Sequence, residues 1–328
     1  MKKYIWPYQI ASFLWRKTFI KIRDKYMDIQ YNKYWKEHRV SEGKKNGEKT
    51  FFVVRRREVY IGLFSYFMTF VYQVAKAIEK GYIPVIDMQN SANMYLKKEQ
   101  VGKVNAWEYF FEQPYGYGLE DIKGSKNIIW GSGWVEEMFP YMDINYLLNT
   151  NGEMNRWKYI AHNYFRINLN IKEEIEKYLE PYTNYRMLGV LCRGTDYTYN
   201  KPKGHAIQPS IEQMFIKIDE IKEIYMCDII FLGTEDKSIY MAFKEKYEEK
   251  VITNRNDFIE YNGENAIGKL VTEGERDLRK EGIDYLMTIS ILAHCNCFIG
   301  GHTSGTVGVM LMNQKFDYTY IFDLGTYE

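Results

Sequence analysis

The sequence is poor in cysteine, balanced in charge, and free of any uninterrupted membrane-spanning run. Its four cysteines, Cys192, Cys227, Cys295 and Cys297, are too few for a disulfide scaffold in 328 residues, and we expect buried, reduced thiols. The 44 Lys and Arg nearly balance the 43 Asp and Glu, which argues against a dedicated nucleic-acid binder. Apolar residues make up 46% of the chain, which excludes a disordered protein.

Two uncharged segments do not have the composition of membrane spans. Val59–Ala75 contains glycine, serine, threonine and glutamine, and Tyr285–Gln314 is interrupted by the glycine-rich run Gly300–Gly305. Both are typical of buried helices and strands in an α/β protein, so we predict no transmembrane helix.

Positive charge is concentrated at the amino terminus. Residues 1–50 hold 13 Lys or Arg against 5 Asp or Glu, and residues 1–25 read as a basic amphipathic helix with aromatic side chains. Such a helix lies on anionic lipid, or packs on the protein with its basic side in solvent. No apolar signal-peptide core follows the first lysines. We therefore expect a cytoplasmic protein, with peripheral contact to the inner face of the membrane as one interpretation.

Strands and helices alternate after a polar linker at residues 41–49. The first series predicts strands at 50–55, 82–86 and 127–130, a helix at 62–80 that ends at Gly81, and a helical stretch at 153–180. The second predicts strands at 187–192, 228–232, 251–253, 297–299 and 318–322, with helices after Pro209 and at 236–247, 275–293 and 305–312. Ser210 and Gln213 have the spacing of a capping box.

This alternation predicts an α/β fold with two Rossmann-like domains and a cleft between them. We place a basic leader at residues 1–49, an acceptor-side domain at 50–180 and a nucleotide-sugar-binding domain at 181–328.

Three polar loops follow strands of the second series, where ligands bind in parallel sheets. They are Arg193–Tyr197 with His205 beyond it, Gly233–Asp236, and Gly300–Gly305. The glycines and hydroxyls of the third loop suit an anion at the start of the next helix, although an ordinary turn has the same composition. Arg193 can hold a diphosphate bidentately or form a salt bridge, for instance to Asp196. His205 either contacts phosphate or is structural.

Several familiar motifs are missing. The sequence has no Asp-x-Asp motif, no zinc-type histidine spacing, no Gly-x-Ser-x-Gly elbow and no Gly-x-Gly-x-x-Gly fingerprint. We therefore expect a site that needs no metal or other cofactor and neutralises a leaving diphosphate with arginine and helix-terminal amides.

The order of these loops resembles that of the inverting GT-B fucosyltransferases of the α1,6-, protein-O- and α1,2-types. The resemblance covers roughly residues 186–315 and is carried by Leu188–Cys192, Arg193-x-Thr195-Asp196, His205 before Gln208–Glu212, Ile229–Asp236, Asp284, and Phe298-Ile299 ahead of Thr303-Ser304. The amino-terminal half resembles the smaller GT-B domain of bacterial polysaccharide-assembly transferases through Gly62–Ser65, Gly81–Asp87 and Trp107–Pro114.

This resemblance implies a donor site for GDP-fucose. Arg193 would hold the β-phosphate, and Asp284 would face the guanine or ribose. Ser304, with Thr303 and backbone amides, would take the pyrophosphate, and Glu235 or Asp236 would read the base or ribose. The remaining implied donor-binding residues are His205, Gly233, His302 and Gly305. Two have plain structural alternatives, since Asp284 and Ser304 could each cap a helix.

The sequence departs from the family at two places. Gly194 stands where the α1,6-type has a second arginine, and no acidic residue follows shortly after Asp196. The general base that inversion requires is therefore open among Asp87, Glu108, Asp196 and His302.

The sequence thus predicts a metal-independent glycosyltransferase that moves fucose from GDP-fucose to a cell-surface oligosaccharide, polysaccharide or lipid-linked glycan. Another nucleotide-sugar donor, or a non-catalytic nucleotide- or carbohydrate-binding protein, are the alternatives.

Overall fold

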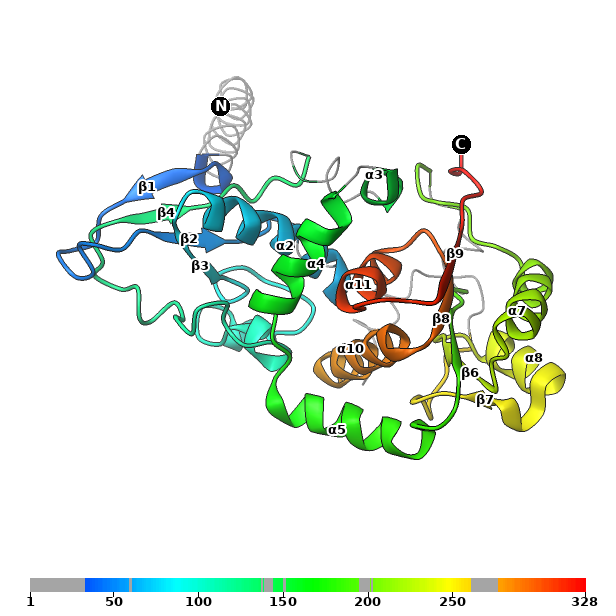
Figure 1. Ribbon diagram of the computed structural model, residues 1–328. Helices are drawn as coiled ribbons and strands as arrows, with labels where there is room; N and C mark the ends of the chain where they lie inside the picture. Colours follow the sequence, from blue (N-terminus) through cyan, green and yellow to red (C-terminus); the bar gives the residue numbers. More distant parts are fainter. Residues whose placement is uncertain are drawn as a thin grey trace, which may run out of the picture.

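The computed structural model describes residues 33–58, 61–136, 138, 144–149, 152–194, 201, 203–260 and 277–328. It has two β-sheets at opposite ends of the molecule, with helices packed between them (Figure 1). The predicted basic helix at residues 1–25 and the candidate Asp196 lie outside the described residues.

The first sheet forms from short apolar strands of the amino-terminal half. Its order is β1 (His38–Val40), β4 (Ile128–Trp130), β2 (Phe51–Val54) and β3 (Ile83–Ile86). β2 pairs in parallel with β3 and β4, whereas β1 runs antiparallel to β4. The three predicted strands of this half are confirmed. β1 is an addition from within the predicted leader, and the domain boundary at residue 49 stays a prediction.

Helix α2 (Leu63–Glu79) connects β2 to β3 and confirms the helix predicted at 62–80. Most of its residues are buried because neighbouring elements cover it on several sides. Gly81 follows its end with φ of +70°, a left-handed conformation that glycine adopts without a Cβ penalty. Its N–H donates to the Ile78 carbonyl at 2.9 Å, which satisfies one of the last helical acceptors.

The outer edge of β3 is covered by side-chain amides rather than by another strand. Gln113 accepts from the Ile86 N–H at 2.8 Å and donates to the Ile86 carbonyl at 3.0 Å. Asn105 donates to the same carbonyl at 2.7 Å and accepts from the Met88 N–H. These bonds satisfy edge groups that could otherwise pair with another chain.

The second sheet is parallel throughout. Its order is β7 (Val251–Ile252), β6 (Ile229–Gly233), β5 (Met187–Leu191), β8 (Cys297–Gly301) and β9 (Tyr318–Phe322). Its connecting helices are α7 (Ile211–Tyr225), α8 (Lys237–Tyr247), α10 (Leu278–His294) and α11 (Ser304–Met312). The capping box predicted at Ser210 and Gln213 is confirmed by both of its hydrogen bonds. The predicted strands and helices of this series are present, and β8 extends two residues further than predicted.

The stretch predicted as helical at 153–180 is two helices, α4 (Glu153–Tyr164) and α5 (Leu169–Leu179). The chain leaves the helix between them because it pairs with residues 110–112: Glu112 donates to the Arg166 carbonyl at 2.9 Å, and Asn168 donates to the Phe110 carbonyl at 3.1 Å. The remaining short elements are α3 (Ile144–Asn149) and 3-10 turns at Lys98–Gln100, Ala106–Tyr109, Glu180–Tyr182 and Glu248–Lys250.

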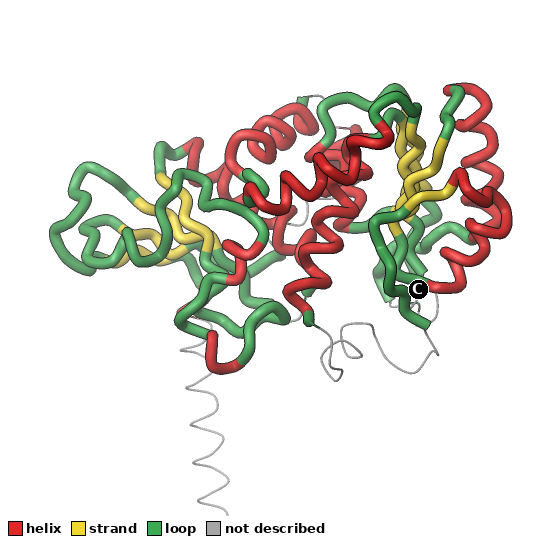
Figure 2. The backbone as a smooth tube through the Cα atoms, turned by 90° about the horizontal axis from the view of Figure 1, so that it is seen from below, coloured by secondary structure: helices red, strands yellow, loops and turns green. Residues whose placement is uncertain are grey.

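One apolar core joins the two sheets. It runs from Phe52 on β2 through α2, α4, α10 and α11 to Phe231 and Phe298 on the second sheet. Figure 2 shows these helices filling the space between the two groups of strands. At Gly308 on α11, an added Cβ would come closer than 3.0 Å to the Phe64 ring of α2, so the two halves touch closely at this glycine. The chain therefore forms the α/β architecture predicted from the sequence, with two Rossmann-like sheet units; the cleft between them stays a prediction.

Candidate active site

The strand order of the second sheet defines where a ligand would bind. From β5 the chain moves outward to β6 and β7, and then returns through α10 to β8 on the other side of β5. The connections after β5 and β8 therefore lead in opposite directions, and ligands of open α/β sheets bind at such a switch point. Leu191, Gly233 and Gly300 lie side by side in register, so the three predicted loops all leave the sheet at the carboxyl ends of its strands.

The first loop lies against the second. The Cys192 N–H donates to the Gly233 carbonyl at 3.0 Å, which holds Arg193 just beyond the strand end. A Cβ on Gly194 would come closer than 3.0 Å to the Asp236 carboxylate and to the Ile239 side chain. The backbone thus has no room for a side chain at residue 194, which explains physically why a second arginine is absent there.

Asp236 caps a helix. Its Oδ1 accepts from the backbone N–H groups of Ser238 at 2.8 Å and Ile239 at 3.2 Å, and from the Ser238 hydroxyl at 2.6 Å. It is the N-cap of α8, and its own N–H donates to Thr234. Glu235 is half-buried whereas Asp236 is buried, and its carbonyl accepts from the Ile259 N–H at 2.8 Å.

The acidic residues of the second loop act on the thiol of Cys192, the residue before Arg193. Burial, together with the charges of Glu235 and Asp236, raises the pKa of the Cys192 thiol to about 12. This thiol therefore stays neutral at physiological pH. All four cysteines are free and buried, as the sequence predicted.

The third loop places a helix start at the switch point. Gly300 and Gly301 belong to β8 rather than to a loop, and Thr303 is the N-cap of α11. Its Oγ1 accepts from the Thr306 N–H at 3.1 Å, and Thr306 in turn donates to the Gly301 carbonyl. Thr303, not Ser304, therefore caps the helix. Ser304 begins it, and the first turn carries no acidic residue, so its backbone N–H groups present positive charge.

Tyr285 was not singled out from the sequence but lies at this helix start. A Cβ on Gly305 would come closer than 3.0 Å to the Tyr285 hydroxyl oxygen, so residue 305 must be glycine for the ring to fit. The Tyr285 ring packs edge-on against Phe64 of α2, with centroids 5.6 Å apart. The start of α2 in the first unit thus reaches the start of α11 through this tyrosine. The sequence signal available was only its position next to Asp284.

Asp284 is held on the exposed side of α10. Its carboxylate pairs with Lys280 at 2.9 Å, and its backbone carbonyl accepts from Asn254 at 3.1 Å and from Thr288 at 2.9 Å. Lys280 and Thr288 lie on α10 itself, and the Asn254 contact joins α10 to the loop after β7. Gly233 also faces α10, because an added Cβ would come within 2.9 Å of the Thr288 methyl group.

His205 lies on an exposed loop tied to the carboxyl terminus. Its carbonyl accepts from the Tyr327 N–H at 2.9 Å, and Gly204 donates to the Tyr327 carbonyl. Gln208 then donates to the His302 carbonyl at 3.2 Å, so this loop reaches the end of β8. His302 itself is partly exposed.

The candidate bases of the first unit hold local structure. Both Asp87 oxygens accept hydrogen bonds, Oδ1 from the Gln89 and Asn90 N–H groups and Oδ2 from the Asn90 amide. Burial raises the pKa of Asp87 above its usual value. Glu108 is exposed and accepts from Gln113 at 2.9 Å. Within the described residues, both carboxylates make their hydrogen bonds inside the amino-terminal half.

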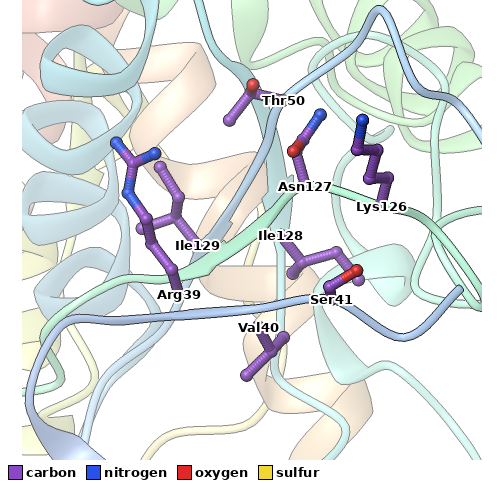
Figure 3. A pocket seen from close by; sticks show the side chains of 8 residues that line it. All are labelled: Arg39, Val40, Ser41, Thr50, Lys126, Asn127, Ile128 and Ile129. Atoms are coloured by element: carbon purple, nitrogen blue, oxygen red, sulfur yellow. The ribbon is translucent and has the colours of Figure 1, made fainter.

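A cavity of about 310 Å³ lies elsewhere. It is lined by β1, β4 and the residues just before β2 and β4, including Arg39, Thr50 and Asn127 (Figure 3). This is the amino end of the parallel strands, opposite to the end where ligands bind in such sheets. Across the described part of the chain, no group of three or more metal-ligating side chains is present, and no helix is long and apolar enough to cross a membrane.

Solved structures of fucosyltransferases are similar to this chain. The crystal structure of fucosyltransferase NodZ from Bradyrhizobium has a TM-score of 0.49 and 16% identity, and covers 85% of this chain and 96% of its own. NodZ alpha-1,6-fucosyltransferase soaked with GDP-fucose has a TM-score of 0.47 and 16% identity, and covers 81% and 93%. POFUT1 in complex with GDP has a TM-score of 0.47 and 13% identity, and covers 84% and 98%. No protein-family model and no curated protein matches the chain.

Proposed function

We propose that this protein is an inverting glycosyltransferase that transfers fucose from GDP-fucose, without a metal ion, to an oligosaccharide, polysaccharide or lipid-linked glycan of the cell surface. The observation that carries the proposal is the switch point of the second sheet. There Arg193 and the start of α11, which Thr303 caps and Ser304 begins, follow adjacent strands, β5 and β8, in the order that the fucosyltransferase motifs have.

The charges at this edge suit a leaving diphosphate. The donor diphosphate would lie between the Arg193 guanidinium and the first turn of α11, where Ser304 and the backbone N–H groups donate. Asp236 is already committed to the cap of α8, so Glu235 is the better candidate for a donor hydroxyl or base edge. Tyr285 would line the same place, since its hydroxyl contacts Gly305.

The reaction is a single displacement. The acceptor hydroxyl oxygen forms a bond to C1 of the sugar while the bond from C1 to the β-phosphate oxygen breaks, and the electron pair leaves with GDP. The hydroxyl proton passes to a base. Arg193 and the amides of α11 stabilise the charge that develops on the diphosphate, so their contribution is greatest in the transition state. The base remains to be chosen among Asp87, Glu108, Asp196 and His302.

The test compares two arginines at opposite ends of one strand. Arg193 follows β5. Arg186 precedes β5 at the amino ends of the strands, where it pairs with Asp317 at 2.7 Å. GDP release from GDP-fucose is measured in EDTA for Arg193→Ala and Arg186→Ala with a surface-glycan extract as acceptor. We expect Arg193→Ala to lose about 10²–10³-fold in turnover, as removal of one transition-state donor does, with its melting temperature little changed. Arg186→Ala should keep its turnover.

The other outcomes separate the alternatives. Full loss of turnover in EDTA would contradict the metal-independent mechanism. Turnover with UDP-sugars in place of GDP-fucose would keep a glycosyltransferase but overturn the donor. Binding of GDP without release of GDP from any donor would favour a non-catalytic nucleotide-binding protein.

We also propose that residues 1–25 bring the protein to the inner face of the membrane, where a lipid-linked acceptor would be carried. The support is the basic, aromatic-rich composition of this segment. Binding to anionic liposomes should weaken as salt is raised and should vanish when residues 1–25 are deleted. Equal binding by the shortened protein would overturn this proposal.

A further inference from the structure

The first sheet has a switch point of its own. β2 lies between β4 and β3, and the chain passes from β2 through α2 to β3 on one side and later returns to β4 on the other. The carboxyl ends of β2 and β4 therefore border the place where such a sheet binds a ligand. Three consecutive arginines, Arg55–Arg57, follow β2, and Gly131–Trp134 follow β4.

Two of these arginines are used inside the fold. Arg55 is 1% exposed and donates to the carbonyls of Gly131 at 2.7 Å and Tyr34 at 2.5 Å. Arg56 is 4% exposed and donates to Glu58 at 3.0 Å and to the Ser65 carbonyl at 2.6 Å. Both guanidinium groups therefore hold the loops at this edge in place.

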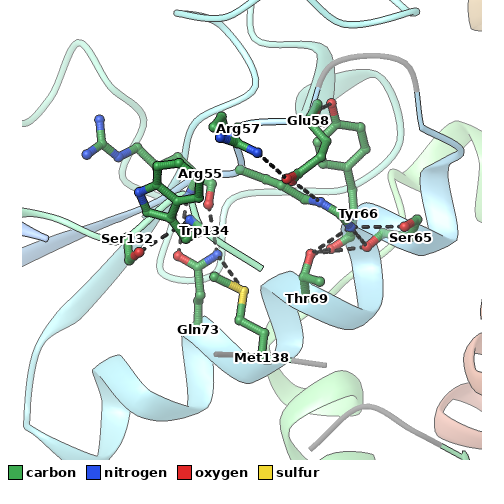
Figure 4. Close-up of polar contacts among 11 residues, drawn as sticks. Arg55, Arg57, Glu58, Ser65, Tyr66, Thr69, Gln73, Ser132, Trp134 and Met138 are labelled. Carbon is green, nitrogen blue, oxygen red and sulfur yellow. Dashed lines mark hydrogen bonds and ion pairs between the residues drawn. The ribbon is translucent and has the colours of Figure 1, made fainter. Parts of the chain in front are cut away.

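Arg57 is arranged differently. Its backbone N–H donates to the Gly133 carbonyl at 3.0 Å, which fixes the residue across the switch point. Its guanidinium carbon lies 3.8 Å from the centroid of the Trp134 ring, and its side chain is 29% exposed. In the described part of the chain its side chain donates no hydrogen bond, and the nearest carboxylate oxygen, on Glu58, is 3.7 Å away. Figure 4 shows Arg57, Glu58 and Trp134 alongside helix α2.

The local charge is not cancelled at Arg57. Glu58 is shared with Arg56, to which it is closer, and Asp87 interacts with Arg55. Among the described residues that these contacts join, three arginines therefore face the two carboxylates of Glu58 and Asp87. A guanidinium held over an indole ring keeps its charge and its N–H donors, and its planar fork matches two oxygens of one anionic group.

We infer that Arg57, held on Trp134, is a second binding site, which takes an anionic oxygen group of the acceptor: the carboxylate of a sugar acid or a phosphate of the acceptor's carrier. That the ligand belongs to the acceptor rests on the proposed function, in which the second sheet binds the donor. The site itself rests on the position, stacking and open N–H groups of Arg57.

The experiment observes Trp134 directly in the full chain. The chain has seven tryptophans, so the protein is labelled with ¹⁵N at the indole, and Trp134→Phe assigns the Trp134 signal. Methyl β-glucuronide and inorganic phosphate are each titrated to millimolar concentration, with methyl β-glucoside as the neutral counterpart. We expect at least one anion to shift the Trp134 signal and the glucoside to leave it unchanged.

Two arginine-to-glutamine variants distinguish anion binding at Arg57 from a general effect of removing one positive charge. Arg57→Gln should lower the affinity for the anion that shifts the Trp134 signal at least tenfold. Arg279→Gln is the matched control, because Arg279 also lies over an aromatic ring, Tyr109 at 4.1 Å, but belongs to α10 and follows neither β2 nor β4. It should bind the anion as the unchanged protein does.

The outcomes assign the source of the anion or overturn the site. A shift with glucuronide alone indicates a sugar acid, and a larger shift with phosphate indicates a phosphorylated carrier. No shift with either anion, an equal shift with glucoside, or an unchanged affinity in Arg57→Gln would overturn the inference. GDP binding is measured on the same samples: GDP binding without a Trp134 response refutes this site alone, whereas a Trp134 response without GDP binding refutes the proposed function alone.

Discussion

Replacing Gly305 by alanine tests the packing that holds the start of α11 in the candidate site. A Cβ there would come closer than 3.0 Å to the Tyr285 hydroxyl and within 3.2 Å of side-chain carbons of Leu191 and Ile289. Tyr285 has little room to retreat, because it packs edge-on against the buried Phe64. Overpacking of this kind costs about 1–3 kcal/mol of unfolding free energy.

Thermal unfolding measures that cost. At about 2–4 °C per kcal/mol, Gly305→Ala should lower the melting temperature by roughly 2–12 °C. GDP affinity should fall as well, because the helix start moves with the backbone. Gly47→Ala is the matched control, since no heavy atom lies within 4 Å of its Cβ position. It should leave both quantities unchanged.

A second variant identifies the atom responsible. Tyr285→Phe removes the oxygen, so Gly305→Ala should cost less in that background, with a coupling of about 0.5–3 kcal/mol between the two changes. The reasoning is refuted if Gly305→Ala is neutral by itself, or costs the same whether residue 285 is tyrosine or phenylalanine.

Three further predictions concern the acidic and thiol groups. Burial raises the pKa of Asp87 above its usual 3.8, so the folded protein keeps a proton that the unfolded chain releases, and the stability owed to that proton is lost as pH rises from about 3.8 through the folded pKa. Asp87→Asn has no such proton to lose, so its free energy of unfolding should rise with pH relative to that of the unchanged protein. Urea unfolding between about pH 4 and pH 7 measures this difference in free energy, and a difference that stays constant with pH would contradict the assignment. Asp236→Ala removes the cap of α8 and should cost about 0.5–2 kcal/mol in the same assay, which Asp236→Ser should largely restore; equal losses in both variants would count against the capping role. Cys192, buried and with a pKa of about 12, should resist iodoacetamide at neutral pH until the protein unfolds, and rapid labelling of the folded protein would contradict its burial.

The sequence predicted the elements well because apolar runs and helix-end residues are local signals. The strands after Thr50 and before Arg193, the Ser210 cap and the turn at Gly81 each depend on a few neighbouring residues. The strand β1 was missed because it is three residues long, carries charged side chains, and forms only by pairing with β4, about 90 residues away.

The site was predicted less completely because it depends on contacts between distant segments. Nothing local in the sequence shows that Asp236 fills the space beside Gly194, or that Tyr285 rather than Asp284 turns toward α11. Arg57 has the same local signal as Arg193, an arginine just after a buried strand. Only the structure separates it from Arg55 and Arg56, by its stacking on Trp134 and its open N–H groups.

The most direct test of the central claim is a calorimetric titration of the full chain with GDP, UDP and GDP-fucose in the presence of EDTA. The account predicts binding of GDP and GDP-fucose, a clear preference over UDP, and loss of that binding in Arg193→Ala but not in Arg186→Ala. Preference for UDP, or equal binding by the two arginine variants, would contradict it.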